Sequence, residues 1–221
     1  MRWHHLGGAS DPVPPNTKAH AVDRGRRIGI VLALLVYRMR LQGVARIPPT
    51  GPVIFAVNHS NTLDGPILFG ALPRRVSFLV KAEMFHGLLG WLLKAVGQYG
   101  LNRDVPDRAP LMSALAQLKA GGSIGIFPEG SRGDGGVESV FNGAGWLAAR
   151  SGASVVPIAM RGTRRPTGTS RRFRPRVEVL IGEAFAVLPG AGRTAVNAAT
   201  AEIREKLKSL VEELDQAETS Q

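Results

Sequence analysis

The sequence predicts an α/β domain with a mixed, largely parallel sheet flanked by helices. Short apolar runs typical of buried strands, such as residues 53–57 and 123–127, alternate with segments whose apolar residues recur at helical spacing. Polar motifs directly follow several of these strands, and parallel α/β sheets carry functional side chains at that edge. With 221 residues, 44% of them hydrophobic, the chain can form one sizeable core. We therefore expect a single folded domain over residues 47–221.

Residues 1–22 are expected to form a mobile leader ahead of this domain. The segment contains Pro12, Pro14 and Pro15, two glycines and few large apolar side chains. Such a composition buries too little apolar surface to offset the entropy lost on ordering.

Residues 23–46 are predicted to contain a helix that lies in a membrane interface. The apolar run 28–37 stands between arginines at 24–27 and at 38–40. It is shorter than the ~20 residues that a spanning helix needs. It also starts too late for a signal peptide, and no small-residue cleavage site follows. Apolar residues in the acyl region with arginines at the headgroups fit an interfacial helix, and the alternative is a core helix.

From residue 47 onward, strands and helices are expected in alternation. The predicted strands are 53–57, 75–80, 98–103, 123–127, 154–160 and 176–185, and the predicted helices are 65–72, 83–96, 107–119, 141–149 and 194–214. Helix 83–96 has apolar residues around much of its circumference, so we expect it in the core, with contact to an acyl chain as the alternative. Helix 194–214 shows one apolar face, formed by Ile203, Leu207, Leu210 and Leu214.

The charge of the chain points to an anionic partner. A formal net charge of +11 suits a nucleic acid, a membrane surface or a phosphorylated substrate. The chain has no cysteine, which excludes disulfides, a thiolate nucleophile and zinc held by cysteine. We expect neither a metal site nor a bound cofactor.

A candidate catalytic motif, residues 58–66, directly follows strand 53–57. It contains His59 and, five positions later, Asp64. Positions five apart on one helix point roughly 140° away from each other, so the two side chains can meet only if the chain turns between them. A histidine beside a fixed carboxylate is a general base suited to neutral pH. We expect Asp64 at the start of helix 65–72, where it can accept hydrogen bonds from free amides.

Three cations on other loops are candidates for binding a phosphate at the same sheet edge. Arg132 belongs to the motif 127–132, in which Gly130 lets backbone amides approach a ligand and the guanidinium can grip phosphate through two hydrogen bonds. Taken alone, that motif also fits an ordinary surface turn. Lys81 and Arg103 follow two other predicted strands. Together the three would hold a phosphate near His59.

Two other functions compete with a site that holds a phosphate beside a histidine base. A serine hydrolase would use Ser131 or Ser60 with His59, but a Gly-x-Ser-x-Gly elbow needs glycine where Glu129 stands. A nucleic-acid-binding protein would use the arginines between 161 and 176, yet only Phe173 stands among them, and no helix-turn-helix or zinc pattern is visible.

The motifs together resemble the 1-acylglycerol-3-phosphate acyltransferase family of glycerolipid acyltransferases. Residues 58–64 fit its His-x4-Asp motif, and 81–84 with 100–103 fit the second. Residues 127–132 fit its Pro-Glu-Gly-Thr/Ser-Arg motif, and 156–158 fit the fourth. All four occur in family order between residues 47 and 182. One departure is Asn142, where family members usually carry a basic residue, and the arginine-rich loop after Arg161 is a candidate replacement.

The resemblance implies transfer of a fatty acyl group from an acyl thioester, either acyl-CoA or acyl-carrier protein, in phospholipid synthesis. The acceptor would be a hydroxyl of a glycerol phosphate or of lysophosphatidic acid, with a different lipid or glycolipid as the alternative. His59 would be the general base and Asp64 would orient it. The implied substrate-binding residues are Lys81, Arg103, Glu129, Gly130, Ser131 and Arg132. We expect a peripheral enzyme on the cytoplasmic face of the cell membrane, with an anionic membrane surface rather than nucleic acid as its partner.

Overall fold

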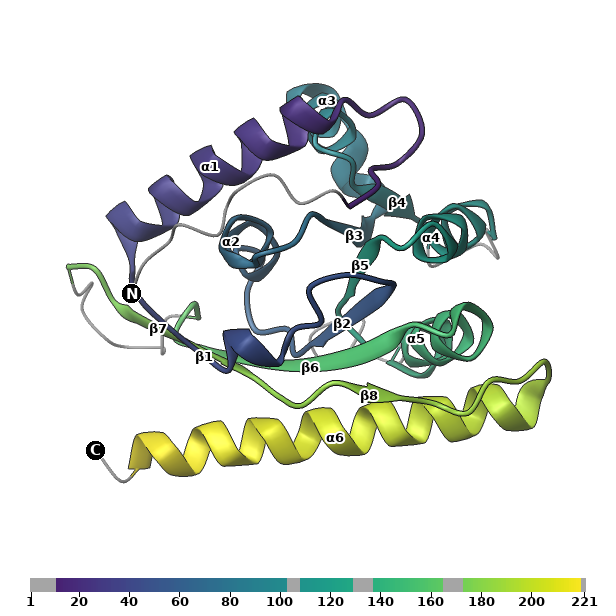
Figure 1. The fold of residues 1–221 in the computed structure, drawn as a ribbon. Coiled ribbons are helices and arrows are strands. Elements are labelled where there is room, and N and C mark those ends of the chain that lie inside the picture. The colour runs from purple at the N-terminus through teal and green to yellow at the C-terminus, as the bar shows by residue number, and fades with distance from the viewer. Residues whose placement is uncertain (1–10, 103–107, 129–136, 165–172, 220–221) are drawn as a thin grey trace.

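The computed structural model describes residues 11–102, 108–128, 137–164 and 173–219, whose strands form one eight-stranded sheet (Figure 1). The strand order is β1-β7-β6-β2-β5-β3-β4, and β8 pairs with β6. The strands are β1 (Arg38–Gln42), β2 (Val53–Val57), β3 (Val76–Lys81), β4 (Tyr99–Leu101), β5 (Ser123–Ile126), β6 (Ser154–Arg161), β7 (Arg176–Ile181) and β8 (Phe185–Ala186).

The sheet is mixed and largely parallel, as the sequence predicts. Strands β4, β3, β5, β2 and β6 run parallel to one another, and β1 runs parallel to β7. The antiparallel pairs are β6 with β7 and β6 with β8. The carboxyl ends of β2, β3, β4, β5 and β6 therefore lie along one edge of the sheet.

Helices cover both faces of the sheet (Figure 1). They are α1 (Ala19–Val36), α2 (Asp64–Ala71), α3 (Gly87–Ala95), α4 (Ala109–Lys119), α5 (Val137–Ser151) and α6 (Arg193–Thr219), with short 3₁₀ turns η1 (Val44–Arg46) and η2 (Ala82–Phe85). Alternate residues of β2 serve the two faces: Phe55 packs in the cluster with α1 and α2, and Ile54 in the cluster with α4, α5 and α6. All five residues of β2 are buried, which explains its unbroken apolar run.

The predicted apolar face of the closing helix α6 is confirmed. Ile203, Leu207, Leu210 and Leu214 are all buried, and α6 lies along the sheet face opposite α1 (Figure 1). None of the helices in the described part of the chain combines the length and apolar content needed to cross a bilayer.

The N-terminal segment differs from the sequence prediction in two ways. The described end of the leader is packed rather than loose: Asp11 is buried against the guanidinium of Arg74, and Val22 lies in the core inside α1. The predicted helix segment 23–46 is helical only as far as Val36, because β1 follows it. An edge strand reading Arg-Met-Arg-Leu-Gln lacks the apolar run by which buried strands are recognised.

Helix α3 is not a core helix, contrary to the sequence prediction. Leu88 and Trp91 are 81% and 66% exposed, and Leu89 and Leu92 are also exposed. Hydrophobic residues around a helix predict burial only if other elements are available to cover them, and α3 lies at the end of the molecule beside the start of α1 (Figure 1).

Helix α1 packs across α2, the helix that begins at Asp64. Gly70 of α2 lies so close to Gly29 and Ile30 that a Cβ there would come within 2.6 Å of the Ile30 amide nitrogen. The buried Arg26 donates hydrogen bonds to the carbonyl oxygens of Phe69 and Leu72 at 3.3 and 2.5 Å. These carbonyls belong to the last turn of α2, where helix carbonyls lack partners of their own. Helix α1 therefore holds α2 in place.

Candidate active site

The site begins at the carboxyl end of β2, the strand between β5 and β6. Asn58 extends the pairing of β2 with β6 by one residue, because its side chain imitates a backbone: Oδ1 accepts from the Met160 amide at 2.7 Å, and Nδ2 donates to the Met160 carbonyl at 3.1 Å. This pairing fixes the position of Asn58, the last residue before His59. It thereby sets the direction in which the chain leaves the sheet.

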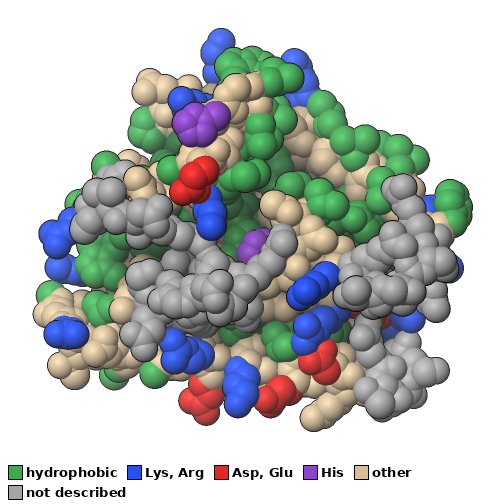
Figure 2. Space-filling view, turned by 180° about the vertical axis from the view of Figure 1, so that it is seen from behind, with side chains coloured by type: hydrophobic (Ala, Val, Ile, Leu, Met, Phe, Trp, Pro, Cys, Tyr) green, Lys and Arg blue, Asp and Glu red, His purple; other side chains and the backbone are tan. Residues whose placement is uncertain are grey.

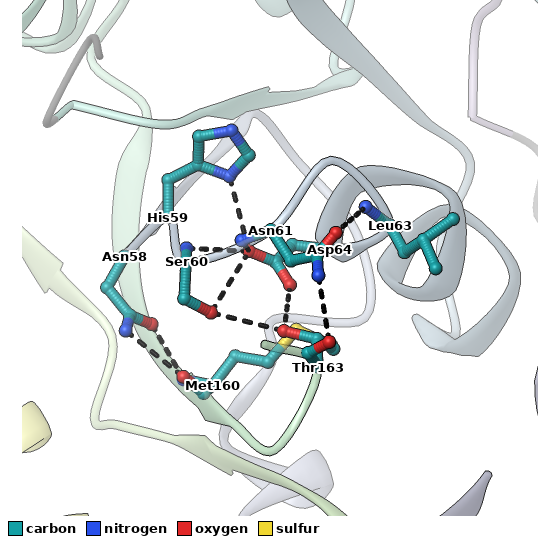
Figure 3. Close-up of polar contacts among 8 residues, drawn as sticks. All are labelled: Asn58, His59, Ser60, Asn61, Leu63, Asp64, Met160 and Thr163. Atoms are coloured by element: carbon teal, nitrogen blue, oxygen red, sulfur yellow. Dashed lines mark hydrogen bonds and ion pairs between the residues drawn. The ribbon is translucent and has the colours of Figure 1, made fainter. Parts of the chain in front are cut away.

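The chain turns between His59 and Asp64, as the five-residue spacing requires (Figure 3). The Asp64 amide donates to the Asn61 carbonyl at 3.0 Å, and α2 begins at Asp64. His59 Nδ1 then lies 3.2 Å from Asp64 Oδ2. The predicted contact and the predicted helix start are both present.

Asp64 is a fully buried carboxylate whose oxygens are all engaged. Oδ2 accepts from the backbone amides of Ser60 and Asn61 at 2.8 and 2.7 Å, and Oδ1 accepts from Thr163 Oγ1 at 2.6 Å. The amides that it binds thus precede α2, whereas a conventional helix cap would bind those of the first turn. Burial alone raises the pKa of Asp64, but the hydrogen bonds from His59, Thr163 and the two amides outweigh it and lower that pKa overall.

An ionised Asp64 selects one tautomer of His59. The carboxylate can only accept, so Nδ1 carries the proton and donates it to Oδ2. Nε2 is then left with a lone pair, and it points away from Asp64 (Figure 3). The histidine side chain is 25% exposed, so it can be reached from solvent. This arrangement is that of a histidine base oriented by a carboxylate.

Phe127 packs against the imidazole of His59. The two ring centroids are 4.5 Å apart with the ring planes tilted by 39°, and Phe78 stacks on Phe127 with a centroid distance of 5.4 Å. Phe127 follows β5 and is the first residue of the motif 127–132. That motif therefore starts against the histidine.

Thr163 is the site residue that the sequence interpretation missed. It is buried two residues beyond β6, its hydroxyl accepts from Ser60 Oγ at 3.1 Å, and its carbonyl accepts from Asn61 Nδ2 at 2.8 Å. A polar residue just past a parallel strand is a usable signal. It singles out Thr163 only once β6 is known to lie beside β2.

Thr163→Val should lower kcat by about tenfold, because a hydrogen bond to a charged group contributes about 1.5–3 kcal/mol and the buried Oδ1 of Asp64 would lose its donor. Steady-state kinetics of the purified variant measure this loss. Thr163→Ser keeps the hydroxyl and should retain most of the activity. A Val variant with unaltered kcat would show that Asp64 does not depend on this hydroxyl.

The remaining predicted site residues fall into two groups. Lys81 is exposed at the end of β3, opposite Leu101 of β4 in register, so the ends of β3 and β4 lie side by side. Its role in substrate binding stays a prediction. The others lie outside the described residues: Arg103, Glu129, Gly130, Ser131 and Arg132.

The serine-hydrolase alternative loses one of its two candidates. Ser60 Oγ faces Thr163 and Asp64, at 3.1 and 3.5 Å, on the side of His59 that Nδ1 occupies. A nucleophile would have to face Nε2, which points the other way. Ser131 lies outside the described residues.

Asn142, the departure from the family pattern, is exposed on α5. It lines a surface pocket between α5 and α6 together with Trp146, Arg150 and Arg193. Two arginines therefore stand near a position where the family usually has a cation. Within the described part of the chain, no group of three or more His, Asp or Glu side chains is arranged to hold a metal ion.

Comparisons with known proteins show which proteins this chain is similar to. A family model described as Acyltransferase matches residues 38–161. A 1-acyl-sn-glycerol-3-phosphate acyltransferase of Bacillus subtilis is 30% identical over 178 residues, which cover 77% of this chain and 86% of that protein. A chloroplastic enzyme of the same name from Arabidopsis thaliana is 33% identical over 140 residues, but the match covers only 39% of its length and 60% of this chain.

A solved structure shares the fold. The crystal structure of the 1-acyl-sn-glycerophosphate acyltransferase from Thermotoga maritima superimposes with a TM-score of 0.69 at 22% identity, covering 88% of this chain and 79% of that one. At that identity the likeness concerns the fold alone.

Proposed function

This chain belongs to the 1-acylglycerol-3-phosphate acyltransferase family, and on that premise we propose that it transfers a fatty acyl group from an acyl thioester to a hydroxyl of lysophosphatidic acid or a glycerol phosphate. One observation carries the proposal. His59 has its Nδ1 held by the buried Asp64 carboxylate and its Nε2 directed away from that carboxylate. Such a base can deprotonate an alcohol.

The proposed reaction is a direct transfer. Nε2 of His59 takes the proton of the acceptor hydroxyl while that oxygen attacks the thioester carbonyl carbon. The carbon–sulfur bond then breaks, and the thiol leaves with the proton returned by the imidazolium. Asp64 stabilises the imidazolium through the Nδ1–H hydrogen bond. No acyl-enzyme forms, and the acyl donor, acyl-CoA or acyl-carrier protein, is a substrate and not a bound cofactor.

We assign the acceptor phosphate to the loops that follow β3, β4 and β5. These strands are parallel to β2 and leave the sheet at the edge where His59 stands. Arg103 and Arg132, with Lys81, would grip the phosphate, and the Glu129-Gly130-Ser131 segment would help to line the site. Part of the rate would then come from placing the hydroxyl beside the base.

We also propose that the enzyme binds an anionic membrane surface at the cytoplasmic face of the cell membrane. The outer face of α1 exposes Ile28, Val31, Leu32 and Leu35, and exposed arginines precede and follow them at Arg24, Arg27, Arg38 and Arg40. The exposed apolar side chains of α3 add to this surface. Hydrophobic side chains gather at the end of the molecule that α1 and α3 form (Figure 2).

Leu35→Asp should weaken binding to vesicles of phosphatidylglycerol and phosphatidylcholine by about tenfold or more. Leu35 is exposed in the protein and would enter the acyl region of the bilayer, where the substitution would place a charge. Vesicle flotation measures the bound fraction. The matched control is Leu188→Asp, since Leu188 is 86% exposed but lies between β8 and α6, away from α1. Equal loss in both variants would mean that α1 is not the docking face.

Three of the arginines that suggested nucleic-acid binding lie in the described part of the chain and have partners there. Arg161 forms a two-bond pair with Asp215 at 2.6 Å, Arg176 pairs with Glu178 at 2.9 Å, and Arg174 donates to a helix carbonyl. These guanidinium groups already have partners within the chain.

The acceptor is identified by an assay of the purified protein with acyl-CoA and with acyl-carrier protein, offering glycerol 3-phosphate and lysophosphatidic acid separately. We expect phosphatidic acid from lysophosphatidic acid. A preference for glycerol 3-phosphate would mean that a different hydroxyl is acylated by the same mechanism. Inactivity toward both acceptors, with either donor, would overturn the proposed substrate class.

A further inference from the structure

The aromatic side chain of Phe173 is almost fully exposed to solvent. It is 93% exposed, three residues before β7 begins. The next residue, Arg174, has a φ of 51°, in the left-handed region that residues with a side chain seldom adopt. An exposed phenylalanine on a constrained turn is a costly arrangement for a soluble surface, and such outliers gather at functional positions.

Arg174 fastens this turn to the end of α1. Its Nη2 donates to the carbonyl oxygen of Leu34 at 2.5 Å and approaches that of Tyr37 at 3.5 Å. Leu34 belongs to the last turn of α1, where carbonyls lack an intrahelical partner and a cation is favoured. Residues more than 130 positions apart in the chain are thereby joined.

The contact between Arg174 and Leu34 brings the turn that carries Phe173 next to the outer surface of α1. At its carboxyl end, α1 exposes Leu35 and Val36, which are 66% and 48% exposed. The backbone behind the turn also runs close to α1, because the Arg38 amide donates to the Pro175 carbonyl at 2.9 Å. The starts of β1 and β7 therefore lie side by side (Figure 1).

An exposed arginine lies close to this turn. Arg38, the first residue of β1, is exposed, and its backbone binds Pro175, two residues beyond Phe173. Its register partner on β7, Arg176, already pairs with Glu178. An exposed aromatic side chain near an exposed arginine suits an anionic bilayer, where apolar groups lie below the phosphates.

We propose that Phe173 is a second membrane anchor, which enters an anionic phospholipid bilayer beside α1 while Arg38 binds a lipid phosphate. The proposal rests on the membrane association proposed above for α1. The two anchors would fix the tilt of the molecule on the membrane, because α1 alone would let it roll about the helix axis.

A single-cysteine label tests the anchor directly, since the natural chain contains no cysteine. Phe173→Cys is labelled with a polarity-sensitive fluorophore and titrated with vesicles of phosphatidylglycerol and phosphatidylcholine. We expect a blue shift and a rise in intensity. Leu188→Cys, an equally exposed apolar position between β8 and α6, is the matched control and should keep its aqueous spectrum.

The titration distinguishes insertion of position 173 from binding through α1 alone, from no membrane binding and from self-association. An aqueous spectrum at position 173 on vesicles that the protein binds through α1 would overturn the second anchor and leave the membrane association standing. If the labelled protein does not bind vesicles at all, the membrane association fails as well. A blue shift that depends on protein concentration without vesicles would assign the surface to a second copy of the chain and refute the lipid assignment.

Phe173→Ser measures how much the anchor contributes. Removal of one aromatic side chain from the acyl region should weaken the partition onto anionic vesicles by about tenfold. Turnover of a short-chain, water-soluble acceptor should stay unchanged, which separates the anchor from the chemistry at His59. An unchanged partition coefficient would contradict the proposal.

Discussion

His59→Ala should lower kcat for acyl transfer by about 10²- to 10⁴-fold, because the variant has no group to take the proton of the acceptor hydroxyl. The fold should survive, since the histidine side chain is one quarter exposed and lies outside the core clusters. Steady-state kinetics and thermal unfolding of the same preparation separate the two effects.

His86→Ala is the matched control for this variant. His86 is exposed at the start of α3 and takes no part in the motif around Asp64. We expect normal turnover from it. If the His59 variant also turned over normally, the general-base role would be wrong whatever the substrate.

Asp64→Asn should have the second largest effect, a fall in kcat of about 10²-fold or more. The carboxylate accepts from His59, Thr163 and two backbone amides, and an amide has only one oxygen with which to replace it. The amide oxygen would take the place of Oδ2, which binds His59 and both amides, and the NH2 group would face Thr163. The imidazolium would then lose the negative charge that stabilises it.

The same substitution has a pH signature. The folded protein lowers the pKa of Asp64, so its stabilising effect is present above the unfolded value, about 3.9, and is lost as pH falls through the folded value. The difference in free energy of unfolding between wild type and Asp64→Asn should therefore shrink below about pH 4. Urea denaturation at neutral and acid pH measures it.

Asp23→Asn controls for acid sensitivity that is unrelated to catalysis. Its pKa is also lowered, chiefly by the hydrogen bond from Arg75. The variant should lose part of the acid dependence and keep its turnover. A pH-independent difference between wild type and the Asp64 variant would show that the carboxylate is not ionised in the folded protein.

The pair at the centre of the site could be predicted because it is local. His59 and Asp64 lie within one turn of chain after a strand that is buried on both faces, and such a strand has an unmistakable apolar run. The pattern around them restricts the geometry strongly: five positions apart, with a helix starting at the second residue. The contact between the two side chains forms entirely within residues 59–64.

Thr163 could not be placed in this way. It lies 99 residues from Asp64, and it reaches the carboxylate because β6 is the neighbour of β2 in the sheet. Strand order depends on long-range pairing that periodicity does not encode. The exposed face of α3 was missed for a related reason: apolar spacing shows which residues avoid water, but not whether another element covers them.

Local sequence patterns also could not predict the edge strand β1 or the packing of the segment that begins at Asp11. Arg38 and Arg40 look like the charged flank of a helix, and only the pairing of β1 with β7 shows their place in the sheet. Asp11 is held by Arg74, a contact between segments more than sixty residues apart. Proline-rich segments are usually loose, and here one buried ion pair and its hydrogen bonds oppose that tendency.

The most direct test of direct transfer from a histidine base is thiol release from the acyl thioester, measured by rapid quench with and without lysophosphatidic acid. Direct transfer predicts thiol release only when the acceptor is present, in amounts equal to the phosphatidic acid formed, and no acyl group on the protein. A burst of thiol equal to the enzyme concentration without acceptor, with the acyl group bound to a serine, would contradict it.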